Sequence, residues 1–350
     1  MVERYDARDI EVLDGLESVR RRPGMYIGST DGQGLAHMLF EIIGNSLDEY
    51  LAGFARRLSV DVDDRGWVSV EDDGRGIPIE EPSTLEAIFT QLHAGATLDD
   101  HHPHVHITEN LRGVGLAPVN ALCSRLEVES RRSGTAHRAV FAFGRIIEPV
   151  KSLGPTNARG TLIRYLPDDE IFDEGARLDF TEVEQRLLQV ARLCPHLDLV
   201  LQGRSLKQPE GLPGWVRELA PDAVKETALS AIGKVNEVEV EVALAWSPSG
   251  TAPRVLSFVN YYRTTQAGSH EQGLISAVRS SVPRAKDGIK EQVLAGLVAV
   301  VHVGMLHPSF RGPTRAALQV DAARVAVHEV VTRAIKDAPW WWDRLHEVLR

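Results

Sequence analysis

The stretch from Leu35 to Gly53, LAHMLFEIIGNSLDEYLAG, most constrains how this chain folds. It contains no proline, and its apolar residues recur three and four positions apart, the period of a helix with one buried face. The opposite face carries His37, Glu41 and Asn45, each four residues after the last. Side chains at this spacing stack on one side of a helix. The sequence therefore predicts an amphipathic helix that presents an imidazole, a carboxylate and an amide together.

This polar face has two interpretations. Amphipathic helices commonly carry a solvated polar face, which alone would account for the pattern. Alternatively, the polar side chains belong to a catalytic site, in which Glu41 acts as a general base, His37 orients or tunes it, and Asn45 binds magnesium or phosphate. The segments that follow in the chain bear on this choice.

The bulk composition is that of an ordinary globular protein. The chain has 350 residues, of which 43% are hydrophobic and 25% charged, and this length suggests about two domains with a core in each. No apolar run reaches the length of about 18 residues that a transmembrane helix needs. The first residues are too polar for a secretory signal. We therefore expect no membrane association.

Cysteine content and charge narrow the possible partners. Cys123 and Cys194 lie far apart and lack metal-ligand spacing, which fits a reducing cytoplasm rather than a disulfide framework. The formal net charge is −10 and the pI about 5.7. An acidic chain is a poor candidate for tight, purely electrostatic DNA binding. Any contact with DNA would require a local basic patch, a partner chain or topological enclosure.

A carboxylate follows the second strand of a predicted hairpin. Residues 58–63 and 67–71 alternate between apolar and polar side chains around a short turn, which favours two antiparallel strands. The second strand runs into Asp72-Asp73-Gly74-Arg75-Gly76-Ile77-Pro78. Its glycines allow a ligand to approach the backbone closely, and Asp73 could accept a hydrogen bond from an exocyclic amine such as that of adenine. A tight acidic turn is the alternative interpretation.

The stretch from Ala94 to Asn110 is long and polar for a connection inside a domain, which indicates a lid. Its histidines are candidates for metal binding, although their spacing matches no common zinc motif and a solvated loop is the alternative. These histidines are His101, His102, His104 and His106. The stretch leads into Leu111–Gly115, LRGVG, ahead of a predicted helix. Glycines at a helix N-terminus suit phosphate binding, but one G-x-G is weak evidence.

The second half of the chain reads as a separate set of strands and helices. Composition shifts near Gly211–Gly214, GLPG, where we place a domain boundary. The residue pattern predicts strands over residues 238–246 and 255–260, and a helix over residues 322–337. The chain ends in a segment that contains Trp340, Trp341 and Trp342. These tryptophans indicate either a docking or oligomer contact or packing within the chain.

Four segments, taken in order, are more specific than any one of them. They are RRRPGMYIG (Arg20–Gly28), FEIIGNSLDEYLAG (Phe40–Gly53), VEDDGRGIP (Val70–Pro78) and LHAG…LRGVG…VNAL (Leu92–Leu122). Together they resemble the ATPase region of the DNA gyrase B protein and the matching chain of topoisomerase IV. These proteins belong to the GHKL ATPases, along with certain heat-shock chaperones, MutL proteins and histidine kinases. The first motif points to the topoisomerase branch.

The resemblance continues from FVN…AGSHEQGL (Phe258–Leu274) to PSFRGPTRAAL (Pro308–Leu318) and thus covers nearly the whole chain. It implies an α+β protein with a GHKL (Bergerat) ATP-binding α/β sandwich followed by a transducer domain, a ribosomal S5-like α/β sandwich. The first domain, residues 1–215, would hold an eight-stranded mixed sheet with helices on one face and a lid at about 95–115. Residues 216–336 would form the transducer and 337–350 a Trp-rich tail.

The resemblance also implies roles for individual residues around ATP and Mg²⁺. Glu41 is the general base for the attacking water, and His37 hydrogen-bonds or tunes it. Asn45 holds the magnesium ion. Arg315, in the transducer loop, gives the γ-phosphate a cation. Tyr5 reaches from the N-terminal arm into the site of a partner chain, so the family implies a homodimer in the ATP-bound state.

Further residues are implied to surround the nucleotide. Asp73 takes the adenine amine, partly through water. The adenine pocket is lined by Arg75, Gly76, Ile77 and Pro78, with Arg138 near its mouth and Thr161 on its floor. The triphosphate is wrapped by Leu111, Arg112, Gly113, Val114 and Gly115. These roles agree with the chemistry of the residues, because a carboxylate can activate water and backbone N–H groups can neutralise phosphoryl charge.

The chain departs from the family pattern at several points. Gly44 stands where the family usually has Asp, one position before Asn45. The phosphate loop usually reads G-G-L-H-G-V-G, whereas this chain has Asn110 and Arg112 within Glu109–Gly115. The transducer loop Q-T-K is replaced by Pro313-Thr314-Arg315, in which arginine keeps the charge but changes reach and geometry. We expect nucleotide binding to survive these changes, while rate, lid closure and coupling to dimerisation are open.

The family's DNA-cleavage domain, with its E-G-D-S-A and D-x-D motifs, does not occur in this sequence, so we expect that the chain alone cannot cleave DNA. We favour a free-standing ATPase module over a fragment of a longer protein. The leading hypothesis is an ATP-driven dimer clamp that closes around DNA or a topoisomerase-like partner. The alternatives are a non-hydrolysing, nucleotide-dependent binding module and a lid that responds to a metal through its histidines.

Overall fold

We describe the fold from a computed structural model of the chain. It describes residues 15–79, 82–92, 115–282, 292–312, 315–339 and 341–348. The chain divides into two compact units, and each is described by itself. Among the described residues, the first unit holds the chain up to Ile43, residues 59–92 and residues 115–179. The second unit holds residues 44–58 and the chain from Phe180 onward.

Eight strands form the first sheet, in the order β5-β4-β3-β6-β2-β1-β7-β8. Their bounds are Arg57–Val62 (β1), Val68–Asp72 (β2), Cys123–Arg132 (β3), Thr135–Ala142 (β4), Arg145–Pro155 (β5), Gly160–Pro167 (β6), Asp198–Leu201 (β7) and Arg204–Ser205 (β8). The pairings β2/β6, β3/β6, β3/β4 and β4/β5 are antiparallel. The expected eight-stranded sheet is thus confirmed, and so is the hairpin at its centre, since β1 and β2 are neighbours.

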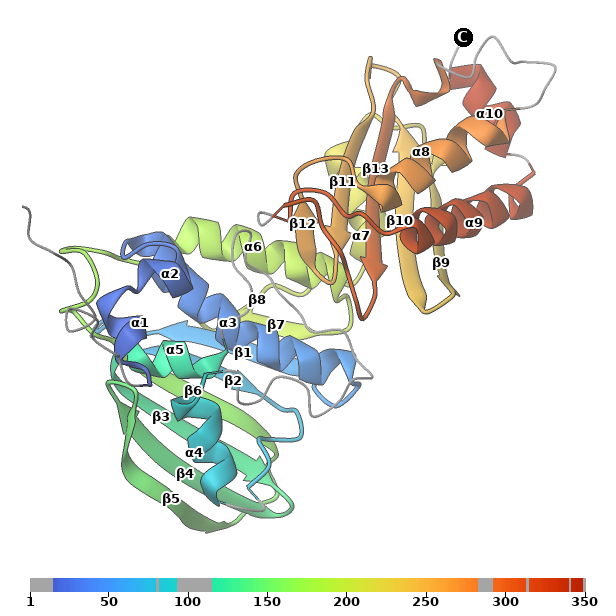
Figure 1. Cartoon of the computed structure of the whole chain (residues 1–350). Helices are drawn as coiled ribbons and strands as arrows, with labels where there is room; N and C mark the ends of the chain where they lie inside the picture. Colours follow the sequence, from blue (N-terminus) through green and yellow to red (C-terminus); the bar gives the residue numbers. More distant parts are fainter. Residues whose placement is uncertain are drawn as a thin grey trace, which may run out of the picture. The chain divides into compact units, whose positions relative to one another are not determined.

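In the sequence, the helices that accompany this sheet lie before β1, between β2 and β3, and between β6 and β7. They are Glu17–Arg21 (α1), Gly24–Ile27 (α2), Gly32–Leu51 (α3), Pro82–Thr90 (α4), Leu116–Ala121 (α5) and Phe180–Leu193 (α6). Figure 1 shows α3, α4 and α5 on one face of the strands. The apolar face of α3 is fully buried through Leu39, Ile43 and Leu47, as the helical period predicts.

The second sheet has five strands in the order β12-β11-β13-β10-β9. They are Leu229–Val235 (β9), Val238–Trp246 (β10), Arg254–Val259 (β11), Tyr262–Thr264 (β12) and Leu297–Gly304 (β13). β11 and β13 are parallel, whereas β10/β13, β10/β9 and β11/β12 are antiparallel. β13 is the middle strand of this sheet, and its side chains are buried over almost its whole length.

Helices cover both faces of the second sheet. They are Gly211–Leu219 (α7), Ser269–Ser281 (α8), Asp321–Asp337 (α9) and Trp341–Val348 (α10), with short 3₁₀ turns at Lys225–Thr227 and Gln292–Leu294. Helices α8 and α9 pack on one face, where Leu274 and Val327 join the strand residue Val301 in one core. Helix α7 packs on the other face, where Trp215 lies against Phe258.

The GLPG segment, near which the sequence analysis places a domain boundary, forms the first turn of α7, whose Leu212 and Trp215 are buried. A proline within the first helical turn removes an N–H that has no partner there in any case. The domain boundary near residue 215 stays a prediction.

The tryptophan-rich tail packs within the chain. Trp341 is fully buried, its ring lies edge-on to Trp246 with centroids 5.2 Å apart, and its Nε1–H donates to the carbonyl oxygen of Thr227 at 3.1 Å. Of the two alternatives for this segment, the structure supports packing within the chain for Trp341. Trp340 lies outside the described residues.

Candidate active site

The polar face of α3 is only partly exposed to solvent. His37 and Glu41 retain 6% and 9% of their accessible surface, whereas Asn45 is exposed. A solvated polar face would leave all of them in water, so that interpretation is wrong for the first two residues. Burying a carboxylate and an imidazole costs stability, and side chains buried at such a cost are often found at functional sites. The polar face of α3 is therefore buried at His37 and Glu41 and exposed at Asn45, within two turns of the helix.

His37 lies beside Glu41 as a neutral neighbour. The distance between His37 Nε2 and Glu41 Oε1 is 3.7 Å, which is too long for a hydrogen bond. Burial lowers the pKa of His37 to about 4, so the imidazole is uncharged near neutral pH and the contact is not an ion pair there. Nε2 has no hydrogen-bond partner in the described part of the chain. The neutral His37 therefore brings no positive charge of its own to the Glu41 carboxylate near neutral pH.

The second oxygen of Glu41 is tied to the end of the predicted phosphate loop. The backbone N–H of Gly115 donates to Glu41 Oε2 at 3.2 Å. Gly115 is the N-cap residue of α5 and has φ +77°, a conformation that favours glycine. Thus one end of α5 and the middle of α3 meet at Glu41. Leu111, Arg112, Gly113 and Val114 lie outside the described residues.

The predicted adenine residues converge where β2 and β6 pair. Asp72, the last residue of β2, lies opposite Thr161 in β6, and Asp73 follows directly. Gly160 has φ +113°, and a Cβ there would come within 1.9 Å of the Asp72 carbonyl oxygen. A glycine is therefore required for this close approach. The buried Asp72 carboxylate accepts a hydrogen bond from Gly74 N at 2.9 Å, which shapes the turn that presents Asp73.

Ser130 holds the following turn against the same strands. It lies opposite Thr161 in the β3/β6 pairing, is fully buried, and donates to the carbonyl oxygen of Ile77 at 2.8 Å. A Cβ on Gly76 would come within 2.7 Å of the Arg131 carbonyl oxygen, and Gly76 has φ +77°. The structure therefore gathers Gly76, Ile77 and Thr161 into one region, while Pro78 follows half-buried.

The two predicted pocket arginines have different surroundings. Arg75 is exposed. Arg138 pairs with Glu127 at 3.1 Å and with Glu148 at 3.6 Å. Residues that pair across an antiparallel sheet have their side chains on the same face. Arg138 pairs with Glu129, whereas Thr161 pairs with the next residue of β3, Ser130. The register thus assigns Arg138 to the other face of the sheet from Ser130 and Thr161. Its placement at the pocket mouth stays a prediction.

Two family models match the chain. The model described as "Histidine kinase-, DNA gyrase B-, and HSP90-like ATPase" matches residues 30–148, and the model described as "DNA gyrase B" matches residues 211–338. The 43K ATPase domain of Thermus thermophilus gyrase B, solved in complex with an aminocoumarin, is 31% identical with a TM-score of 0.82. That match covers 96% of this chain and 94% of the solved one. This chain belongs to the gyrase B-like family of GHKL ATPases.

Curated relatives of the gyrase B-like chain are longer than it is. The DNA gyrase B protein of Streptococcus pneumoniae is 34% identical over 340 residues, which cover 90% of this chain and 52% of the relative. The corresponding B protein of DNA topoisomerase 4 from Mycoplasma genitalium is 35% identical over 358 residues, covering 95% of this chain and 56% of the relative. The chain therefore spans about half the length of the curated relatives it matches.

The remaining predicted site residues of the gyrase B-like chain lie in other parts of the sequence than those described above. Arg315 belongs to the second unit, is half-buried, and adopts φ +51°, with its guanidinium carbon 5.9 Å from the centre of the Phe310 ring. Left-handed backbone at a non-glycine residue is uncommon and marks a constrained position. Tyr5 and the lid histidines lie outside the described residues.

Two features are absent from the described residues of the gyrase B-like chain. No described helix combines the length and apolarity that a membrane crossing needs. No three side chains of His, Cys, Asp or Glu gather in that part of the chain as a metal site would require. Both cysteines, Cys123 and Cys194, are unpaired thiols in the interior.

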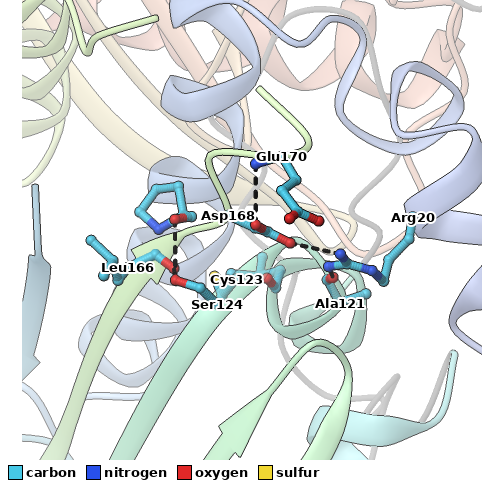
Figure 2. Close-up of polar contacts among 9 residues, drawn as sticks. Arg20, Ala121, Cys123, Ser124, Leu166, Asp168 and Glu170 are labelled. Carbon is cyan, nitrogen blue, oxygen red and sulfur yellow. Dashed lines mark hydrogen bonds and ion pairs between the residues drawn. The ribbon is translucent and has the colours of Figure 1, made fainter. Parts of the chain in front are cut away.

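Several residues that shape the site act through contacts between segments that are far apart in the sequence. Asp72, Ser130 and Gly160 act through pairings between strands that are far apart in the chain. Arg20 is another example, although it opens a family motif. Its guanidinium donates to Asp168 Oδ2 at 2.6 Å and to the carbonyl oxygen of Ala121 at 2.8 Å, as Figure 2 shows. These contacts could not be predicted without knowing which segments meet.

Proposed function

We propose that this chain binds and hydrolyses ATP with magnesium as a gyrase B-like module, and that it dimerises when ATP is bound. The observation that carries the proposal is the placement of Glu41. Its carboxylate is buried on α3, accepts a hydrogen bond from the last residue of the predicted phosphate loop, and stands beside an uncharged His37. This is the arrangement that activation of a water beside a γ-phosphate requires.

In this proposal Glu41 takes the proton of the attacking water. The hydrogen bond from the Gly115 N–H to Glu41 Oε2 ties the carboxylate to the end of the predicted phosphate loop, where the water would attack. His37 stays neutral and lies 3.7 Å from the carboxylate, where it would help to position Glu41 by contact. Asn45 is exposed one helical turn beyond Glu41, and its amide oxygen suits the oxygen coordination of magnesium. When bound, magnesium would neutralise part of the negative charge on the phosphates.

Asp73 would accept the exocyclic amine of adenine. Its position directly after the Asp72–Thr161 pair supports this role, since the strands end there and Gly160 leaves room. Gly76, Ile77 and Thr161 would contact the base, with Pro78, Arg75 and Arg138 farther out. The residues Leu111, Arg112, Gly113, Val114 and Gly115 would donate to the phosphates, and Arg315 would supply a cation to the γ-phosphate.

The wider activity of the chain also belongs to the proposal. Tyr5 would extend into the nucleotide site of a second copy, so that ATP binding and dimerisation are coupled. The closed dimer would act as a clamp around DNA or a topoisomerase-like partner protein. The chain alone would not cleave DNA, and the two unpaired cysteines suit a cytoplasmic location.

A non-hydrolysing, nucleotide-dependent binding module is the second candidate function. Two departures from the family favour it, since Pro313 removes a backbone N–H from the transducer loop and Arg112 alters the phosphate loop. Such a module would bind ATP and change its association state without turnover.

A comparison of two Glu→Gln variants tests the proposal. Glu41→Gln keeps the shape of the side chain but removes the base. Glu86→Gln makes the same change at an exposed position on α4 and serves as the control. We expect Glu41→Gln to lower the rate of ATP hydrolysis by about 100-fold or more, and Glu86→Gln to leave it unchanged. Steady-state hydrolysis and calorimetric binding of a non-hydrolysable ATP analogue provide the measurements.

The outcomes separate the two candidate functions. Hydrolysis that is lost in Glu41→Gln, with the analogue still bound, supports the ATPase. Binding of the analogue by the wild type without any turnover would favour the non-hydrolysing module. Absence of both binding and turnover would contradict both.

A further inference from the structure

Arg20 joins three parts of the first unit. It lies in α1, its guanidinium reaches the carboxylate of Asp168 after β6, and it also donates to the carbonyl oxygen of Ala121, the last residue of α5 (Figure 2). Its guanidinium carbon also lies 5.0 Å from the centre of the Phe143 ring. One side chain thus fixes the end of α5 relative to α1, to the exit of β6 and to the β4–β5 turn.

Asp168 completes this anchor from the opposite side. Its side chain is 6% exposed, and its own N–H donates to the carbonyl oxygen of Leu122 at 3.0 Å. Its second carboxylate oxygen accepts from Glu170 N at 3.2 Å. A buried carboxylate left without its cation is strongly unfavourable. Each partner therefore holds the other, and both hold the C-terminal end of α5.

The whole of α5 is fixed by contacts of this kind. All its residues are buried. The last carbonyl groups of a helix lack partners within the helix, and here Ala121 O is bound by Arg20, while Asn120 O accepts from Gly144 N at 3.2 Å. The side chain of Asn120 donates to the carbonyl oxygen of Phe89 in α4 at 2.8 Å. The helix has little freedom to slide or rotate.

The other end of α5 reaches Glu41. Gly115 is the N-cap of this helix, and its N–H is bonded to the Glu41 carboxylate. A short, fully packed helix transmits a displacement of one end to the other, because close-packed interiors deform little. We propose that Arg20 and Asp168 are positioning residues for Glu41, acting through α5. This inference rests on the proposed ATPase function.

The type of contact that Arg20 makes supports a positioning role over mere attachment of α1 to α5. Apolar packing would be enough to attach α1 to α5. A guanidinium that bonds a carboxylate and a carbonyl at once also fixes direction, because its donors lie in one rigid plane. The neighbouring Arg21 offers a comparison, since it is about half exposed and pairs within α1 with Glu17 at 2.9 Å.

Three variants test the positioning role. Arg20→Met keeps an unbranched side chain but removes both hydrogen bonds and the guanidinium over Phe143. Asp168→Asn is a milder change of the same pair. Arg21→Met removes one arginine from the same helix and is the matched control. The measurements are kcat and KM for ATP hydrolysis, the Kd of a non-hydrolysable ATP analogue and the melting temperature, with the kinetic and binding assays run below the unfolding transition.

We expect Arg20→Met and Asp168→Asn to lower kcat by about 10-fold or more, since displacement of a catalytic group by about 1 Å has such effects. KM and the analogue Kd should change clearly less than kcat, because the predicted adenine residues belong to β6 and the turn after β2, and of the predicted phosphate donors only Gly115 caps α5. The double variant should be no slower than the worse single one, since both changes break one pair. Arg21→Met should behave as wild type.

Other results would overturn the inference while leaving the ATPase intact. One is a normal kcat in Arg20→Met. Another is a loss of kcat no larger than the fraction of protein unfolded at the assay temperature, which would assign the pair to stability alone. The proposed function fails separately if the wild type does not hydrolyse ATP, or if Glu41→Gln hydrolyses it normally, and the positioning role would fall with it.

Discussion

At the scale of single residues, burial separates polar side chains of α3 that their spacing alone cannot tell apart. His37, Glu41 and Asn45 are equivalent by spacing, yet the first two are buried and the third is exposed. The buried pair is joined to the rest of the site by the hydrogen bond from Gly115 to Glu41. An uncharged imidazole beside a carboxylate fits a base and its neighbour, while the exposed amide fits a metal ligand in contact with solvent.

His37 gives a prediction about acid stability. Burial lowers its pKa from 6.5 to about 4, so the folded state favours the neutral ring. The stability that the folded state gains from a neutral His37 is fully present above pH 6.5. It is lost as the pH falls through about 4, where the buried ring becomes protonated. We expect His37→Leu, which cannot be protonated, to lose about 1–3 kcal/mol less stability than wild type between pH 7 and pH 4.

Urea unfolding at both pH values measures this difference. His196→Leu, the same substitution at an exposed position outside α3, is the control. An equal loss of stability in wild type and His37→Leu would contradict the neutral, buried histidine.

The sequence predicts the residues of this site that are close together along the chain. Helical spacing was enough to align His37, Glu41 and Asn45, and a strand followed by glycines was enough to single out Asp73. Ser130 and Gly160 could not be found in this way, because their roles depend on the register of β3, β6 and β2. A one-residue change of register would exchange the faces of these side chains.

At the scale of elements, strands with one buried face were predictable and edge elements were not. β2 alternates regularly between buried and half-buried side chains, whereas β5 is exposed along most of its length and so lacks an apolar pattern. α7 was missed because Gly and Pro occupy its first turn, where they are tolerated but read as a turn signal. Tertiary packing on β10 and β13 stabilises this helix.

α10 provides a test of packing at this scale. Trp341 is fully buried against Trp246, whereas its neighbour Trp342 is half-buried. We expect Trp341→Ala to lower the free energy of unfolding by about 3–5 kcal/mol, because it removes a large side chain from a close-packed core. Trp342→Ala, the matched control, should cost clearly less. Thermal unfolding of both variants checks the order, and equal costs would contradict the placement of the tail in the core.

At the scale of the whole molecule, the chain combines two sheets that each have their own helices and cores. The sheets differ in order and in strand direction, and separate family models match residues 30–148 and 211–338. The proposed general base belongs to the region of the first model and Arg315 to that of the second. Hydrolysis that depends on both would therefore report on cooperation between the two regions, which neither sheet provides alone.

Dimerisation follows from the same proposal and can be measured directly. If Tyr5 completes the nucleotide site of a second copy, binding energy from ATP is available to stabilise the dimer. We expect light scattering to give the mass of a 38.6 kDa monomer without nucleotide and a mass about twice as large with a non-hydrolysable ATP analogue. Tyr5→Ala should weaken this shift, while Glu86→Gln should preserve it. The specific rate of hydrolysis should also rise with protein concentration until the dimer is saturated. A monomer under every nucleotide condition, with a specific rate independent of concentration, would exclude the clamp and leave an ATPase that works as a single chain.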